Sequence, residues 1–407
     1  MAKRRLKNWL DTYIEYHAAL KTPPLFPIWT GLWTIGAALE RKVWCRTMSK
    51  PVFPNLYIFL VSSSGAGKGN SLQTAREFVS TLYPNEATAT SSITSAFLAQ
   101  SLQGAKREWV NPLTNRGEVY HSVNIASAEL QVLIPEYNLD MLAKLTDMYD
   151  CLSYGEGRRS DSDTFSCSKT FVSMLGATTE SHFFTTFPEA VFSTGFMSRI
   201  VIVHAESGPR QSLFLEKYTG KELLKMEEDM MEDLKHFQTI RGEFKFSDDA
   251  RELIDAFYTY PGNMGGAPIP DHPNLSTYCE RRHLQIEKTM IINSVMRDDE
   301  LLLTEEDYHW AYNLLMETEE AMPGLFKSSH DASEVSLVDQ CLHTIAKNNA
   351  KGKYPSKDSI IAYLAKKTQF YNAERLFTLI STRGVIVPST EAPGGWKAQR
   401  MTFADDD

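Results

Sequence analysis

One short stretch of the sequence, residues 62–71 (SSSGAGKGNS), has the composition of a loop that binds phosphate groups. Glycines let the backbone approach a phosphate closely, and a lysine in such a loop meets the β- and γ-phosphates of a nucleoside triphosphate. The residues that follow have helical spacing, so the positive end of a helix would complete the site. We therefore predict that ATP contacts Ser63, Ser64, Gly65, Ala66, Gly67, Lys68, Gly69 and Asn70.

This loop departs from the usual pattern at two positions. Ser62 stands in place of the first glycine, and Gly69 stands where a serine or threonine hydroxyl usually contacts Mg²⁺. We expect Mg²⁺ to be held largely through water, with Ser71, Asn70 or Asp150 as further ligands. The alternative is a glycine- and serine-rich turn between a strand and a helix that binds nothing.

An ATPase also needs a carboxylate that orients the attacking water, at the end of a neighbouring strand. Glu129 meets this requirement, because it lies just past the apolar run of residues 122–126 (SVNIA). Ala128 occupies the position in which an aspartate usually binds Mg²⁺, so a second metal ligand is missing. The alternative is that Glu129 is an ordinary carboxylate at the start of a helix.

Two further positions are candidates for action on the γ-phosphate. Thr178 and Thr179 end the apolar run FVSMLGATT, and we predict that Thr179 senses the γ-phosphate. Arg199 comes immediately before the run IVIVH, where an arginine of a ring-shaped ATPase stabilises charge at the nucleotide of the neighbouring subunit. The alternative for Arg199 is a surface arginine that flanks a strand.

The spacing of apolar residues predicts the elements that position these side chains. Short apolar runs alternate with helical segments, which predicts an α/β fold with the parallel sheet of a P-loop NTPase core. The expected strands are residues 56–61, 122–126, 171–177 and 199–204, with one more at 84–90. Helical spacing at 7–40 predicts N-terminal helices, and the same spacing at 219–238, 248–259, 275–296 and 305–322 predicts a helical lid.

Polar stretches divide the chain into five predicted parts. These are an N-terminal helical segment (1–50), an ATPase core (51–206), a helical lid (207–332), a winged helix of three helices and two strands (333–403) and an acidic tail (404–407). Residues 333–403 hold ten Lys and Arg against five Asp and Glu, although the whole chain has a net charge of −9. The C-terminal part is therefore the basic module.

Composition excludes several classes of protein. No apolar run reaches the ~18 residues of a membrane span, and the first residues lack the apolar segment of a signal peptide. We therefore expect a cytoplasmic protein with no membrane partner. The cysteines occur singly, which predicts neither a disulfide framework nor a zinc site. They are Cys45, Cys151, Cys167, Cys279 and Cys341.

The order of these motifs resembles the AAA+ class of ATPases. Residues 195–204 (GFMSRIVIVH) are similar to the arginine-finger segment of minichromosome-maintenance helicases, and residues 278–294 followed by 303–315 resemble the lid of that group. The resemblance implies ATP and Mg²⁺ as cofactors, Arg281 or Arg282 as a second nucleotide sensor, and a homo-oligomer, expected to be a hexameric ring. ATPases of phages and mobile elements have counterparts of residues 26–44, 54–69 and 195–203, which implies a role in DNA replication.

Two segments of the core are expected to contact single-stranded DNA. Residues 151–168 form a polar loop with Arg158 and Arg159 at its tip, where a helicase hairpin grips phosphates in a central pore. The alternative is a solvated loop. Residues 104–121 are a candidate for a second hairpin, in which Lys106 and Arg107 supply charge and Trp109 stacks on bases.

The winged helix offers a third surface. Arg375 in its last helix and Lys397 in its wing are the expected DNA contacts. Such modules serve protein contacts equally often, so both kinds of partner stay open.

These features favour an oligomeric ATPase that moves along or remodels DNA, best described as a replicative helicase of a phage or mobile element. One alternative is an ATP-binding helicase loader or switch with little turnover, because Gly69 and Ala128 both remove metal ligands. Another is a nucleotide kinase, suggested by SGAGKG, although a kinase hardly needs a basic winged helix. Turnover that is abolished by Glu129→Gln would exclude the switch.

Overall fold

The computed structural model describes the chain in segments that together form two compact units. The described segments are residues 4–18, 22–48, 50–84, 95–112, 114–134, 138–156, 165–187, 189–192, 194–206, 220–259, 269–270, 272–365 and 370–399. The units are Met1–Leu325 and Phe326–Asp407. The first unit therefore includes the predicted N-terminal segment, the predicted core and nearly all of the predicted lid.

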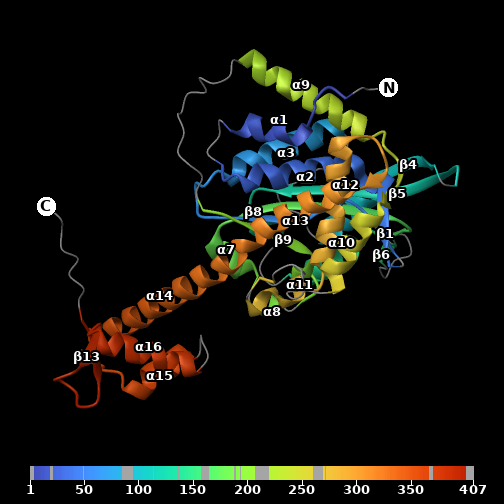
Figure 1. Cartoon of the computed structure of the whole chain (residues 1–407). Helices are drawn as coiled ribbons and strands as arrows, with labels where there is room; N and C mark the ends of the chain where they lie inside the picture. The colour runs from blue at the N-terminus through green and yellow to red at the C-terminus, as the bar shows by residue number, and fades with distance from the viewer. Residues whose placement is uncertain are drawn as a thin grey trace. The chain divides into compact units, whose positions relative to one another are not determined.

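A five-stranded sheet forms the centre of the first unit (Figure 1). In spatial order its strands are β4 (Lys106–Asn111), β5 (Arg116–Ser127), β8 (Thr170–Thr178), β3 (Tyr57–Val61) and β9 (Ile200–His204). The last four run parallel, whereas β4 forms an antiparallel hairpin with β5. Every residue of β3 and β8 is buried, as expected for apolar strands that are covered on both faces. The predicted α/β fold with parallel strands is confirmed, and the strand predicted at 84–90 lies outside the described residues from 85 onward.

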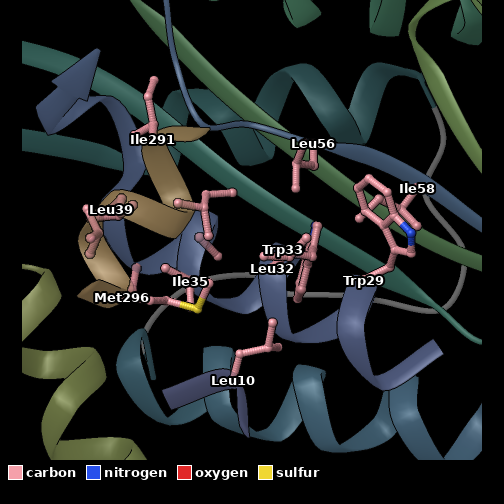
Figure 2. Packing of buried hydrophobic residues seen from close by; sticks show 14 of the residues in the cluster. Leu10, Trp29, Leu32, Trp33, Ile35, Leu39, Leu56, Ile58, Ile291 and Met296 are labelled. Atoms are coloured by element: carbon pink, nitrogen blue, oxygen red, sulfur yellow. The ribbon is translucent and has the colours of Figure 1, made fainter. Parts of the chain in front are cut away.

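Two helices, α2 (Leu25–Leu39) and α3 (Lys68–Leu82), cover one face of this sheet, and α1 (Trp9–His17) packs on their outer side against α2 (Figure 1). In α2 only Ile28 is not buried, because the helix is apolar around its whole circumference and is enclosed by other elements. Figure 2 shows Trp29 and Leu32 of this helix beside Leu56 and Ile58, at the start of β3. The predicted N-terminal helices are thus part of the main core.

The opposite face is covered by α6 (Leu139–Tyr149), α7 (Glu180–Thr186) and the 3₁₀ turn η3 (Met197–Arg199). Aromatic rings fill this layer, with Phe59 stacked on Phe187 at 5.4 Å and Tyr57 edge-on to Tyr149 at 4.9 Å between ring centroids. The first unit also contains five short elements in this part of the chain. They are α4 (Ser95–Gly104), α5 (Leu130–Leu133), β6 (Tyr154–Glu156), β7 (Phe165–Cys167) and α8 (Glu189–Phe192).

The region predicted as a lid is helical and belongs to the first unit. Its elements are α9 (Gly220–Phe237), α10 (Asp248–Thr259), η4 (Pro273–Leu275), α11 (Ser276–Cys279), α12 (Arg282–Arg297) and α13 (Glu305–Glu320). The single helix predicted at 275–296 is therefore divided into two. The sequence did not predict the small strand pairings of the first unit. η1 (Glu40–Lys42) leads into β1 (Val43–Thr47), which pairs with β2 (Lys50–Val52) and joins the N-terminal part to this region by pairing with β10 (Gly242–Glu243). Within the region itself, β11 (Lys245–Phe246) pairs with β12 (Leu302–Leu303).

The second unit consists of helices and a two-stranded ribbon. Its helices are α14 (Met322–Asn349), which begins in the first unit, α15 (Lys357–Ala365) and α16 (Phe370–Thr382). The antiparallel ribbon is β13 (Ile386–Pro388) with β14 (Trp396–Ala398). Phe377 of α16 meets Trp396 edge-on at 5.1 Å between ring centroids, so helix and ribbon share one small core. Three helices and two strands are the elements expected for residues 333–403, but the first helix begins at Met322 and runs continuously across the predicted boundary at residue 333.

Candidate functional site

The predicted phosphate-binding loop joins the end of β3 to the first residue of α3. Gly65 and Gly67 have φ angles of 74° and 94°, a backbone region that favours glycine. Because Lys68 is the first residue of α3, the amides at the start of this helix lie directly beside the loop. Ser63, Ser64, Gly65, Gly69 and Asn70 are exposed, and Ala66 is buried. The loop therefore presents backbone amides at the carboxyl edge of the sheet.

The Lys68 side chain folds back onto this loop. Its Nζ donates to the carbonyl oxygens of Ser62 and Ser63 at 2.9 and 2.8 Å, and to the Ser62 hydroxyl at 3.1 Å. Burial lowers the pKa of Lys68, and the carboxylates of Glu129 and Glu180 act in the opposite direction. Two acidic side chains from neighbouring elements therefore lie close enough to act on the lysine of the loop.

Ser71 and Gly69 are the two positions in α3 at which a metal ligand was considered, and they differ in exposure. Ser71 is fully buried, and its hydroxyl has no partner among the residues the structure describes, so its placement does not favour a contact with Mg²⁺. Gly69 is exposed, and a Cβ built there would have no heavy atom within 4 Å. The missing hydroxyl at this position is therefore not explained by lack of space.

Glu129 is exposed at the N-terminus of α5, past the end of β5. Its side chain makes no capping hydrogen bond to this helix, which argues against the alternative of an ordinary capping carboxylate. Because β8 separates β5 from β3, Glu129 lies two strands away from the strand that leads into the loop. This distance leaves room for a phosphate group between the carboxylate and the loop.

The strand between them, β8, ends at the predicted sensor. Val61 of β3 pairs in register with Thr178, so Thr179 stands beside the start of the loop. The Thr179 hydroxyl accepts a hydrogen bond from the amide of His182 at 3.4 Å and thereby caps α7. This bond uses only a lone pair of the hydroxyl oxygen, so the Thr179 O–H can donate to a phosphate oxygen without breaking the cap, by turning away from Ser181 Oγ, which lies 3.2 Å away.

Two residues at the same edge were missed by sequence reasoning. Glu180 directly follows Thr179, and His204 is the last residue of β9. His204 Nε2 lies 3.0 Å from Glu180 Oε1, and His204 Nδ1 lies 3.1 Å from the carbonyl oxygen of Ala321. The signal that could have found them is simple: His204 is the last residue of one predicted parallel strand and Glu180 comes shortly after the end of another, where ligand sites of such sheets form.

Arg199 lies at the opposite edge of the sheet from the loop. It immediately precedes Ile200, which pairs in register with Tyr57, the first residue of β3, whereas Lys68 follows the last. The five residues of β3 rise ~3.3 Å each, so the two edges are roughly 16 Å apart. This is more than an arginine side chain spans, so Arg199 cannot reach the nucleotide loop of its own chain.

The guanidinium of Arg199 is also held in place. It donates to the carbonyl oxygen of Gly195 at 2.6 Å and to Asp150 at 3.2 Å, and only 8% of the side chain is exposed. Asp150 is also 3.6 Å from Arg281. The expectation that Asp150 helps to bind Mg²⁺ at the loop is therefore wrong, because this carboxylate lies with Arg199 and Arg281 at the other edge. The same placement removes Arg281 from the nucleotide loop.

Arg282 is buried inside the helical region. It forms an ion pair with Glu319 in which Arg282 Nε lies 2.9 Å from Oε1, and the exposed fractions of the two side chains are 3% and 4%. The Tyr278 hydroxyl donates to the same carboxylate at 2.9 Å. With its charge committed to Glu319, Arg282 is part of the core, which contradicts its predicted role as a nucleotide sensor.

The predicted hairpin of residues 104–121 is present as β4 and β5, but its inward face is not open to DNA. Arg107 Nε is 3.2 Å from the buried Glu40, and Trp109 is 8% exposed, edge-on to Trp44. The expected stacking of bases on Trp109 is therefore wrong. Lys106 points outward and lies 2.7 Å from Glu108 in a pair that is mostly exposed. Of the predicted contacts in this hairpin, Lys106 alone lies on the exposed face of β4.

The remaining predicted DNA contacts fall in two places. Arg158 and Arg159 lie outside the described residues. In the second unit Arg375 is exposed on α16, and Lys397 on β14 is half-exposed and 3.3 Å from Glu391. Both residues lie on the surface, as contact with a partner requires.

Comparison with known proteins does not assign the chain to a family. The sequence matches no protein-family model and no curated protein.

None of the helices described by the structure combines the length and the apolar character that crossing a bilayer requires. Within the same described residues, no three His, Cys, Asp or Glu side chains gather in a way that could hold a metal ion.

Proposed function

We propose that this chain binds ATP with Mg²⁺ at residues 62–70 and hydrolyses it, as an oligomeric ATPase that moves along or remodels DNA. One observation carries the proposal: a glycine-rich loop leads from a buried parallel strand into a helix that begins at Lys68, and Glu129 and Glu180 lie just past the ends of β5 and β8 at the same edge of the sheet. Loop amides, a lysine and nearby carboxylates at the carboxyl edge of a parallel sheet suit phosphoryl transfer to water.

The residues of the loop fit a triphosphate. Lys68 would exchange its contacts with Ser62 and Ser63 for phosphate oxygens, and the amides at the start of α3 would face the same anion. Glu129 would accept the proton of the attacking water from the far side of β8. Mg²⁺ would neutralise charge on the phosphates. With no hydroxyl at Gly69, no acid at Ala128 and Ser71 buried, its shell would consist mainly of phosphate oxygens and water.

The position of Arg199 supports action between copies of the chain. Since this side chain cannot reach its own loop, any contact with a nucleotide would be made in a neighbouring subunit, as an arginine finger requires. A cavity of about 470 Å³, lined by α6 and the residues before β9, opens beside it and offers a place for a second copy to approach. In a ring of such subunits each nucleotide would lie between two chains.

The Arg199–Asp150 ion pair favours a second candidate function, a nucleotide-binding switch or helicase loader with little turnover. An arginine that stays paired within its own chain supplies no charge to a neighbouring site, and Gly69 and Ala128 remove metal ligands as well. In this case binding of ATP alone would drive assembly. The two candidates differ in one measurable quantity, the rate of hydrolysis.

The experiment measures ATP hydrolysis by the full chain with and without single-stranded DNA. Lys68→Ala and Arg199→Ala are each expected to abolish turnover, and a mixture of the two is expected to recover part of it, because mixed oligomers contain sites with both residues intact. Lys245→Ala, an exposed lysine paired with Glu243 at 2.7 Å, is the matched control. Nucleotide binding without turnover in the unmodified protein would refute the motor and support the switch.

A further inference from the structure

The contact between Glu180 and His204, here called the clasp, spans the exit of β3. β8 and β9 flank β3, and in register Val61 of β3 pairs with Thr178 on one side and with His204 on the other. Neighbouring strands lie ~4.8 Å apart, so β8 and β9 are separated by roughly 10 Å. The 3.0 Å contact between Glu180 Oε1 and His204 Nε2 bridges this gap, where the chain leaves the sheet and enters the loop.

The clasp faces the nucleotide loop on one side. The Ser62 amide lies 3.5 Å from the carbonyl oxygen of Thr178, two residues before Glu180. The carboxylate of Glu180 also lies close enough to Lys68 to oppose the effect of burial on its pKa. A negative group that binds at the loop therefore arrives beside a carboxylate that is already present.

On its other side the clasp contacts the end of α13. His204 Nδ1 is 3.1 Å from the carbonyl oxygen of Ala321, the residue between α13 and α14. The two ring nitrogens of His204 therefore face two oxygen atoms that can accept hydrogen bonds, one of a backbone carbonyl and one of a carboxyl group. The ring is thus held by two acceptors at once, and a change at Glu180 alters the charge balance of the bond to Ala321.

We propose that the clasp reports occupancy of the nucleotide loop to the start of α14. This inference rests on the proposed function, because it needs a phosphate group at Lys68. With a triphosphate in the loop, Lys68 leaves the carbonyl oxygens of Ser62 and Ser63, and Glu180 is repelled by the new negative charge. Glu180 then releases His204, and the ring loses the carboxylate that fixed its orientation toward Ala321.

Release of His204 would change the backbone at the start of α14, the helix that follows Ala321. α14 begins at Met322, directly after Ala321, and carries the chain from the first unit into the second. Glu180 and His204 are positioning residues in this scheme, because they act through Lys68 and Ala321 and form no bond with the reacting water.

The test is hydrogen exchange of the backbone amides in residues 316–326 of the full chain, with and without the ATP analogue ATPγS and Mg²⁺. In the unmodified protein we expect exchange here to rise roughly tenfold with nucleotide, the factor expected for loss of one hydrogen bond to a charged group. In His204→Ala the exchange should already be fast, and nucleotide should change it little. A fluorescent ATP analogue should still bind to this variant, which separates coupling from binding.

Two further variants keep the test decisive. Glu180→Gln preserves the shape of the side chain but removes its charge, and should give fast exchange in the absence of nucleotide. His309→Ala is the matched control, because His309 lies 3.2 Å from Glu305 in an exposed pair on α13, away from the clasp. It should behave as the unmodified protein.

The outcomes separate the clasp from the nucleotide site. Bound nucleotide without any change of exchange in residues 316–326 would overturn the clasp and leave the proposed function standing. An unaltered nucleotide response in His204→Ala would overturn it as well. Failure of the unmodified protein to bind nucleotide would overturn the proposed function, and the clasp with it.

Discussion

Substitution of Arg282 by methionine separates a structural role from a sensing role. Methionine keeps much of the apolar stem but removes the guanidinium, which pairs with Glu319 and lies 5.1 Å from the centre of the Phe257 ring. Both side chains are almost fully buried, so the carboxylate would keep only the hydrogen bond from Tyr278. Breaking a buried ion pair at one partner costs about 3–5 kcal/mol, and we expect the free energy of unfolding of the first unit to fall by this amount.

The same substitution should make stability depend on pH. Burial raises the pKa of Glu319, and Arg282 opposes this effect in the unmodified protein. Without Arg282 the folded state binds a proton more readily than the unfolded state, so stability falls as pH rises through the interval between the two pKa values. The deficit of Arg282→Met should therefore be larger at about pH 8 than at about pH 5.

Unfolding in urea, followed by tryptophan fluorescence, measures these changes, because six of the seven tryptophans lie in the first unit. Arg281→Met is the control, since this neighbour forms only a partly exposed pair and should cost at most about 1 kcal/mol. The double variant Arg282→Met with Glu319→Gln should recover most of the loss. If Arg282→Met instead kept normal stability and weakened ATP binding, the structural role of Arg282 would be refuted.

Three further predictions test the nucleotide loop and the hairpin. Gly69→Ser and Gly69→Ala should both fold, because a Cβ at this position meets nothing within 4 Å, and only the serine should tighten Mg²⁺-dependent ATP binding in a titration with a fluorescent nucleotide. Equal affinity in the two variants would show that the hydroxyl does not reach the metal. Glu129→Gln should slow hydrolysis by roughly 10²–10⁴-fold with little change in nucleotide affinity, and unchanged turnover would exclude it as the base. Trp109→Ala should lower the free energy of unfolding by about 3–5 kcal/mol, because the ring is buried against Trp44. If Trp109→Ala instead had normal stability in denaturant and bound single-stranded DNA more weakly, stacking of bases on Trp109 would be supported.

The main elements could be predicted because their signals are local. The apolar runs that became β3, β5, β8 and β9, and the glycines and lysine between β3 and α3, lie within a few residues of one another. Pairing of β1 with β10 joins Val43 to Gly242, and short strands like these carry too little pattern to indicate a partner so far along the chain. The pairing of these short strands could therefore not be predicted from the sequence.

Side-chain direction explains the errors at the site. On a strand, alternate residues face opposite sides, so Lys106 is exposed while Arg107 turns inward to Glu40, a residue 67 positions earlier. Arg281 and Arg282 are adjacent, yet at the start of a helix their side chains diverge by roughly 100°, one toward Asp150 and the other into the core. Residue type alone could not distinguish a basic contact from a buried partner of an acid.

The two edges of the sheet set a condition on any mechanism that uses both Lys68 and Arg199. These residues follow and precede parallel strands that pair in register, so the full length of β3 separates them within one chain. No rotation of an arginine side chain closes that distance, whereas the carboxyl edge of one copy can face the amino edge of the next. If Arg199 takes part in hydrolysis, Asp150 must release it and a second copy must supply the nucleotide. The recovery of turnover in mixed variants therefore tests the geometry of one chain and the assembly of several together.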